Sequence, residues 1–168
     1  MTRSAVRFHG EHRFHGSVSS VSAILADPAF YLELDLPDLG RPELLEHRAE
    51  GHETVVRLRY EFVGSLDPIA QRLIGSSRLV WVQEVRVDRS AGSGALRFEA
   101  EKSPRQLYGT ADFVLTPGEG DSVRTLDGEL VVAVPGIGRM AERRIVPGLV
   151  RRLDIEAEAL NAQLEQER

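Results

Sequence analysis

Three histidines lie at even spacing near the start of the chain, in the stretch RFHGEHRFHG (7–16). Histidine is the commonest metal ligand in proteins, and its proton exchanges near neutral pH. His9, His12 and His15 could therefore hold a metal ion or take part in acid–base chemistry. Which of these is possible depends on whether the segment is helix or strand, because that decides which side chains share a face.

The residues around these histidines predict a strand over 5–14. Apolar and charged side chains alternate there with a period of two, which indicates a half-buried strand. His12 then shares the apolar face, while His9 and His15 share the opposite face and lie about 20 Å apart along the strand. Three ligands cannot converge on one ion from that arrangement. We expect no metal site, but two solvent-facing histidines and one interior histidine with a hydrogen-bond partner.

The composition is that of an ordinary globular chain without thiol chemistry. Its 168 residues suit one domain with a real core, which we place at 1–168. The net charge of -5 provides no basic field for nucleic acid. The absence of cysteine excludes disulfides, thiolate catalysis and cysteine-ligated zinc. Lys102 is the only lysine, which leaves little room for catalysis by a lysine amine.

No targeting segment or cofactor motif stands out. The start lacks the apolar run of a signal peptide, and no apolar run approaches the roughly 20 residues that span a bilayer. We expect a cytoplasmic protein with no stable membrane insertion. The stretch PGIG (135–138) precedes a helix, but it has the spacing of neither a P-loop nor a dinucleotide fingerprint. We interpret it as a strand-to-helix turn and expect no cofactor.

The pattern after the first strand predicts two short helices. Ser17 or Ser19 can cap the first helix. Asp27 ends it, because the residue before Pro28 disfavours helical backbone. A second short helix follows. Strands are then predicted at 43–51, 53–64, 77–89, 95–103, 107–117 and 122–136, with a short helical insertion at 65–76.

The chain ends with a long amphipathic helix. Apolar residues recur near every fourth position from Ile137 to Leu164, and Pro147-Gly148 should kink or divide this helix. Sequential strands with hairpin-sized connections imply an antiparallel sheet. We therefore predict an α+β fold, in which a curved seven-stranded antiparallel sheet wraps around the long C-terminal helix, with two short helices after the first strand.

This order of elements resembles the START-like superfamily and its helix-grip fold, which includes lipid-transfer domains, plant hydrophobic-ligand carriers and polyketide cyclase/dehydratase-like proteins. More narrowly, the chain resembles a bacterial domain family of unknown function within that superfamily. The residues that carry the resemblance are RFHGEHRFHGSVSSVSAILADPAFY, LVWVQEVRV and VPGIGRMAERRIVPGLVRRLDIEAEALN. The resemblance implies a cavity between sheet and helix for an apolar small molecule or lipid. It carries over no catalytic residues.

The side chains that alternate onto the inward face of the strands are mostly apolar, but a few of them end in polar groups. Such a pattern is typical of ligand sites, where a few polar groups orient an otherwise apolar molecule. The candidate orienting groups are His12, Tyr60 and Gln83. The candidate apolar wall is Phe62, Trp81, Phe98, Phe113 and Met140. The alternative is a filled interior, in which all of these are core residues and the polar tips bond to the backbone.

Other charged residues have simpler interpretations. Asp112, Asp127 and Glu129 face away from the helix by parity, which argues against a catalytic carboxylate pair. Outward arginines and glutamates on the strands from 53 to 89 predict cross-strand charge pairs. Acidic residues are interspersed among the arginines of the terminal helix. Ion pairs between residues three or four positions apart therefore explain these arginines better than a membrane-docking surface does.

We expect a binding protein, a carrier or sensor of a hydrophobic small molecule or lipid, rather than an enzyme. One alternative is a cyclase/dehydratase-like enzyme acting on an apolar substrate, for which His12 and Tyr60 are the titratable groups on offer. The other alternative is a protein-interaction module with a filled core, whose helix face binds a partner.

Overall fold

The computed structural model describes residues 5–64, 68, 71, 78–136 and 138–167. Its strands are β1 (Ala5–Phe14), β2 (Glu43–Glu50), β3 (Glu53–Glu61), β4 (Val80–Asp88), β5 (Ser93–Ala100), β6 (Leu107–Pro117) and β7 (Ser122–Val132). Its helices are α1 (Val18–Leu25), α2 (Pro28–Glu33) and α4 (Gly138–Gln166). The helical insertion predicted at 65–76 falls almost wholly outside the described residues.

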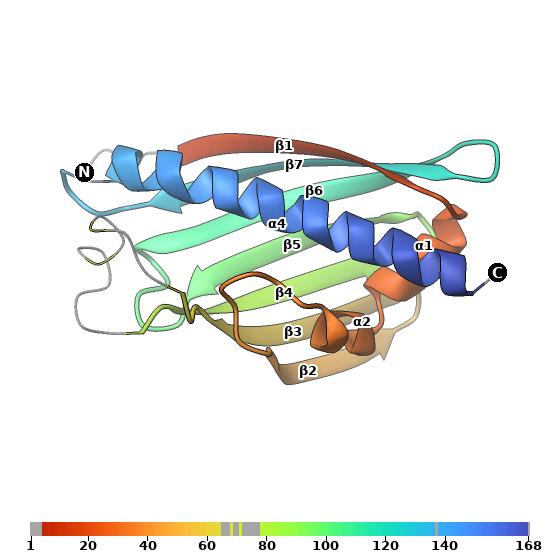
Figure 1. Ribbon diagram of the computed structural model, residues 1–168, viewed down its shortest axis with the longest axis horizontal. Coiled ribbons are helices and arrows are strands. Elements are labelled where there is room, and N and C mark those ends of the chain that lie inside the picture. Colours follow the sequence, from red (N-terminus) through yellow and green to blue (C-terminus); the bar gives the residue numbers. More distant parts are fainter. Residues whose placement is uncertain (1–4, 65–67, 69–70, 72–77, 137, 168) are drawn as a thin grey trace.

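The strands form one antiparallel sheet in the order β1-β7-β6-β5-β4-β3-β2. The first strand of the chain therefore pairs with the last one. The sheet curves around α4, which lies along its concave face, while α1 and α2 cover one end (Figure 1). This arrangement confirms the predicted α+β fold and the order of its elements.

Local signals in the sequence position the two short helices. The Ser17 hydroxyl caps α1 by accepting a hydrogen bond from the Ser20 backbone N–H at 3.1 Å. The Asp27 carboxylate caps α2 in the same way, accepting from Ala29, and Pro28 begins that helix. Both helix starts agree with the sequence, and Ser17 rather than Ser19 is the cap of α1.

The terminal helix is a single element, so the division at Pro147-Gly148, one of the two outcomes that the sequence predicted, does not occur. Pro147 lies inside α4 and is exposed. A proline removes one intrahelical hydrogen bond, the one to the carbonyl four residues earlier. That residue, Arg143, is exposed as well, so water can replace the lost bond. The helix therefore runs past the proline without being divided.

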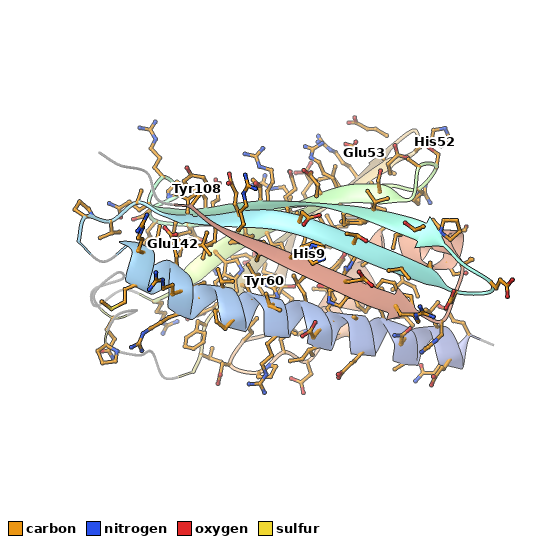
Figure 2. The ribbon with its side chains drawn as sticks, turned by 90° about the horizontal axis from the view of Figure 1, so that it is seen from above. His9, His52, Glu53, Tyr60, Tyr108 and Glu142 are labelled. Atoms are coloured by element: carbon orange, nitrogen blue, oxygen red, sulfur yellow. The ribbon has the colours of Figure 1, made fainter. Side chains whose placement is uncertain are left out.

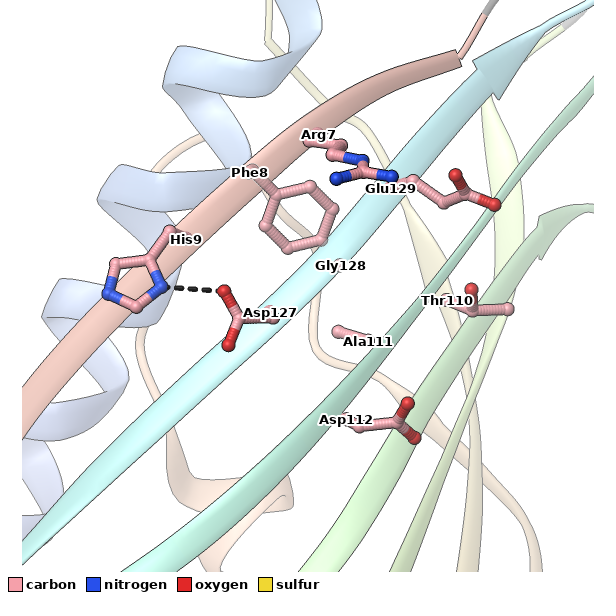
Figure 3. Close-up of a pocket in the computed structure, with 9 residues that line it drawn as sticks. All are labelled: Arg7, Phe8, His9, Thr110, Ala111, Asp112, Asp127, Gly128 and Glu129. Carbon is pink, nitrogen blue, oxygen red and sulfur yellow. Dashed lines mark hydrogen bonds and ion pairs between the residues drawn. The ribbon is translucent and has the colours of Figure 1, made fainter.

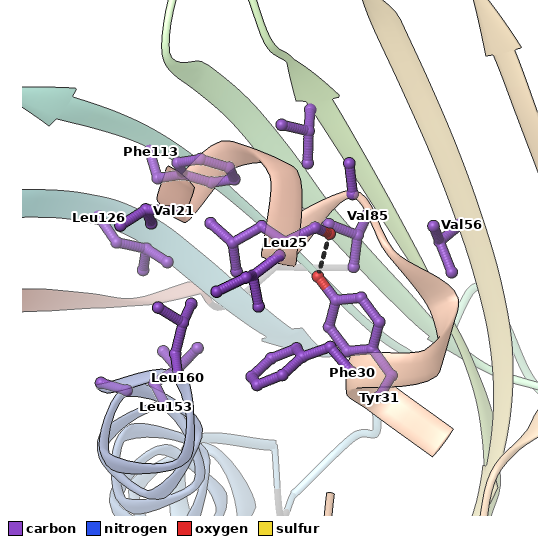
Figure 4. Close-up of a cluster of buried hydrophobic side chains, with 14 of the residues drawn as sticks. Val21, Leu25, Phe30, Tyr31, Val56, Val85, Phe113, Leu126, Leu153 and Leu160 are labelled. Atoms are coloured by element: carbon purple, nitrogen blue, oxygen red, sulfur yellow. Dashed lines mark hydrogen bonds between the residues drawn. The ribbon is translucent and has the colours of Figure 1, made fainter. Parts of the chain in front are cut away.

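The main core lies at the end of the sheet that α1 and α2 cover (Figure 4). There the C-terminal half of α4 is packed closely, and Leu160 is fully buried among side chains from α1, α2 and the sheet. The N-terminal half of α4 differs. Before Leu153, those of its apolar side chains whose burial is described are half-buried or exposed. The interior is thus closed at one end and looser at the other.

Charge pairs cover the outer face of the sheet, as the sequence predicted. Arg86 on β4 contacts Glu84 at 3.0 Å and Glu53 on β3 at 2.8 Å. Arg57 on β3 lies 3.7 Å from Glu46 on β2. These are partly exposed pairs, worth little individually, and they identify this face as a solvated surface.

Candidate functional site

An ion pair is buried between the sheet and α4. Arg124 projects inward from β7 and donates to a Glu156 carboxylate oxygen on α4 at 3.1 Å. The two side chains are only 1% and 5% exposed. The Arg124 guanidinium also lies 5.4 Å from the centre of the Phe14 ring. Because charges this deep are costly unless paired, the pair fixes α4 against β7.

His12 extends the ion pair into a network. Its Nδ1 lies 3.2 Å from Nη2 of Arg124, and its Nε2 lies 3.0 Å from an oxygen of Asp154. Arginine can only donate, so Nδ1 accepts and Nε2–H donates to Asp154. Burial lowers the pKa of His12, and the Arg124 charge lowers it further, although the carboxylates of Asp154 and Glu156 oppose this. The prediction of an interior histidine with a hydrogen-bond partner is confirmed.

The network predicts a loss of stability on acidification. The pKa of His12 in the folded state lies below the ordinary histidine value of 6.5, so the unfolded chain takes up this proton first as the pH falls. His12 therefore contributes its full stability above about pH 6.5 and loses it progressively below that value. Urea unfolding across this range should show a falling free energy of unfolding. His12→Gln should flatten this slope more than His15→Gln, which removes an exposed imidazole; equal slopes in the two variants would refute the role of burial.

An aromatic pair lies on the inward face of β3 and β4. The rings of Tyr60 and Trp81, direct cross-strand partners, stack with centroids 5.7 Å apart and planes at 16°. The Arg152 guanidinium of α4 lies over them, 4.4 Å from the Tyr60 centroid and 6.0 Å from the Trp81 centroid. Figure 2 shows Tyr60 on the side of the sheet that α4 covers. The three residues thus join the helix to the sheet by stacking and a cation–π contact.

The Tyr60 hydroxyl is a donor that has no acceptor among the residues the structure describes. Tyr60 is 1% exposed, and within the described ranges its hydroxyl has no acceptor; the polar group that faces it is the Arg152 guanidinium, which can itself only donate. Burial raises the pKa of Tyr60, and the nearby Arg152 charge only partly offsets this, so the hydroxyl keeps its proton. It can therefore donate to a molecule that reaches it.

Around the aromatic pair, inward-facing apolar side chains remain partly accessible. We call this set the half-buried wall; its members come from β4, β5 and the first half of α4. They pack against the two core clusters but are not fully covered. The half-buried wall consists of Trp81, Leu96, Phe98, Val146 and Leu149.

The structure separates the candidate wall residues of the sequence into three places. Trp81 and Phe98 are half-buried and face inward, and Phe62 is half-buried just beyond β3. Phe113 belongs to the closed core beside α1 (Figure 4). The remaining residue, Met140, is 53% exposed and does not line the interior.

The position expected for Met140 is taken by an acid. Glu142 on the first turns of α4 is fully buried, and its carboxylate accepts a hydrogen bond from the Val132 backbone N–H at the end of β7. The helix is therefore rotated so that the charged residue points inward and the apolar one outward.

The candidate polar side chains, His12, Tyr60 and Gln83, are all buried on the inward face, at 7%, 1% and 6% exposure.

Three residues of the site were not singled out from the sequence: Arg124, Arg152 and Glu156. Arg124 has the same strand parity as the buried Leu126, so alternation alone would have placed it inside. Arg152 and Glu156 are spaced by four on the inner stripe of α4. Their charge made them look like surface residues, although their spacing follows the core.

His9 and His15 are exposed to solvent, as predicted. The His9 Nδ1 lies 2.7 Å from a carboxylate oxygen of Asp127, and both residues line an open hollow around Gly128 (Figure 3). Asp112 and Glu129 line the same hollow, on the face opposite α4. Within the part of the chain that the structure describes, no cluster of histidine, aspartate and glutamate could hold a metal ion.

Solved structures with the same fold span almost the whole chain. The Zhui aromatase/cyclase from Streptomyces sp. R1128 has a TM-score of 0.68 and 14% identity, covering 97% of this chain and 95% of that one. Norcoclaurine synthase from Thalictrum flavum, in complex with dopamine and hydroxybenzaldehyde, has a TM-score of 0.66 and 16% identity, covering 99% and 90%. A START superfamily protein from Mycobacterium smegmatis has a TM-score of 0.59 and 16% identity, covering 99% and 100%.

These similarities, with the curved sheet and long terminal helix, show that the chain has the helix-grip fold of START-like proteins. Residues 10–164 match the model of the DUF2505 family, described as a protein of unknown function, and the chain belongs to that family. Among curated proteins, none matches. No helix within the described ranges is both long and apolar enough to cross a membrane.

Proposed function

We propose that this protein binds a hydrophobic small molecule or lipid between the sheet and the first half of α4, as a carrier or sensor. The observation that carries the proposal is the half-buried wall on the inward face. Covering these side chains with a ligand would gain about 25 cal/mol for each Å² of apolar surface removed from water. We place this function in a single cytoplasmic domain.

The contrast between the two ends of the interior supports this proposal. At the closed end, α1, α2 and the last turns of α4 bury Phe14, Val21 and Leu160 completely. At the other end, Leu130 and Val132 of β7 are covered, but Trp81, Phe98 and Leu149 on the inward faces stay partly exposed. A core filled throughout would cover both ends alike. Inward-facing apolar surface beside a few polar groups is typical of ligand sites.

The named structural relatives are consistent with such a site. Norcoclaurine synthase was crystallised with dopamine and hydroxybenzaldehyde, which are small aromatic molecules. The identity is too low to transfer a ligand to this chain, and the likeness supports only the use of the fold around a small molecule.

Trp81 provides the test, because it is the only tryptophan in the chain. We expect the neutral probe N-phenyl-1-naphthylamine to brighten on binding and to quench Trp81 emission by energy transfer. Trp81→Phe should abolish the quenching but retain probe emission. The purified protein should also carry an apolar compound that native mass spectrometry and organic extraction detect. A protein without such a compound that also fails to bind the probe would have a filled core, contrary to the proposal.

Catalysis is a second candidate, favoured by the aromatase/cyclase relative. It would need a free acid or base facing the ligand. Both ring nitrogens of His12 are engaged, by Arg124 and Asp154. Of the two titratable groups offered by the sequence, this leaves Tyr60, whose burial keeps it protonated. The occupancy of His12 supports binding rather than cyclase-like chemistry.

A further inference from the structure

Arg152 is a cation on the inner face of α4 that has no carboxylate partner among the described residues. No described carboxylate lies within ion-pair distance of its guanidinium, which instead rests on the rings of Tyr60 and Trp81. Glu156, one turn further along the same face of the helix, is already bound to Arg124. Arg152 therefore has nitrogen donors available at the edge of the half-buried wall.

A second donor lies directly beneath it. The Tyr60 hydroxyl is buried and has no acceptor within the described ranges, as shown above. A buried donor left unpaired is unfavourable, so a nearby acceptor would be stabilising. Arg152 and Tyr60 thus present donors from α4 and β3, and the surrounding side chains of the half-buried wall are apolar.

We propose that the ligand is an amphipathic carboxylic acid, whose carboxylate is bound by Arg152 and Tyr60 and whose apolar body covers the half-buried wall. This rests on the proposed function above. The planar guanidinium fork matches a carboxylate with two parallel hydrogen bonds. Its stacking on the aromatic pair holds that fork in place before the ligand arrives, which limits the entropy lost on binding.

The acidic residues nearby do not occupy this place. Glu156 is held by the buried guanidinium of Arg124, and Asp154 is engaged by His12. Neither carboxylate comes within ion-pair distance of Arg152, because each is held by its own partner. A ligand carboxylate would thus form a charge pair with Arg152 next to the existing pair of Arg124 and Glu156.

The test compares dodecanoate with dodecanol, which share a chain length and differ in the charged head. Titration of the wild-type protein at neutral pH, followed by Trp81 fluorescence, should show dodecanoate binding at least about tenfold more tightly. Arg152→Gln should remove this preference by weakening dodecanoate binding much more than dodecanol binding. Tyr60→Phe should reduce the preference in part.

Arg151→Gln is the matched control, because it removes the same charge from the neighbouring, exposed position of α4. It should leave the preference intact. Equal affinities of the two ligands for the wild-type protein would overturn the carboxylate proposal while leaving the proposed function in place. Failure of both ligands to bind would instead overturn the proposed function. Neither outcome depends on the folding of a variant.

Discussion

Glu156→Gln is expected to lower the free energy of unfolding by about 3 kcal/mol, which is a large share of the stability of an ordinary domain. The substitution keeps the shape of the side chain but removes its charge. Arg124 would then remain buried and charged, 1% exposed, without a compensating carboxylate. Leaving one member of a buried ion pair unpaired is far more costly than losing an exposed pair. Urea unfolding measures the difference.

Two further variants separate this cause from others. Asp154→Asn removes a carboxylate from the same helix, but its side chain is 59% exposed, so a loss of about 1 kcal/mol or less is expected. The double variant Arg124→Met/Glu156→Leu removes both charges and should recover most of the stability. If it were as unstable as Glu156→Gln alone, the uncompensated charge would not be the cause.

Leu160→Ala is expected to reduce stability more than Leu149→Ala, and Leu149→Ala is expected to weaken ligand binding more than Leu160→Ala. Leu160 is fully buried at the closed end, so truncation leaves a cavity and is expected to cost about 3 kcal/mol. Leu149 is half-buried, and its truncation should cost about 1 kcal/mol or less. Thermal or urea unfolding of the two variants checks this difference.

Ligand binding should reverse the order. Leu149→Ala removes part of the half-buried wall and should weaken binding of N-phenyl-1-naphthylamine about three- to tenfold, in line with lost apolar contact area. Leu160→Ala should leave probe affinity unchanged under conditions where the variant is folded. Probe binding that depends on Leu160 and not on Leu149 would place the ligand at the wrong end of the interior.

The fold followed from the sequence because alternation and helix caps are local signals. The parity of β1 placed His12 inside and His9 outside, and the Asp27-Pro28 step separated α1 from α2. Such signals need no knowledge of distant contacts. They also indicated that Tyr60 and Gln83 point inward, which the structure confirms.

The buried charged residues of the site could not be predicted from local sequence signals. Arg124 and Glu156 are buried only because each neutralises the other, and they are 32 residues apart in the chain. Sequence rules place an isolated charge on the surface, since its burial is unfavourable without a partner. The rotation of α4 that exposes Met140 likewise depends on the Glu142 contact with Val132, a tertiary hydrogen bond.

The location of a bound apolar molecule is the property to measure. An NMR titration of isotopically labelled protein with N-phenyl-1-naphthylamine would map it residue by residue. Binding between the sheet and the first half of α4 predicts shifts of the Trp81 indole, Phe98 and Leu149 signals, with Leu160 unaffected. An absence of shifts in the half-buried wall, or shifts confined to the outer face around His9, would contradict ligand binding in the interior.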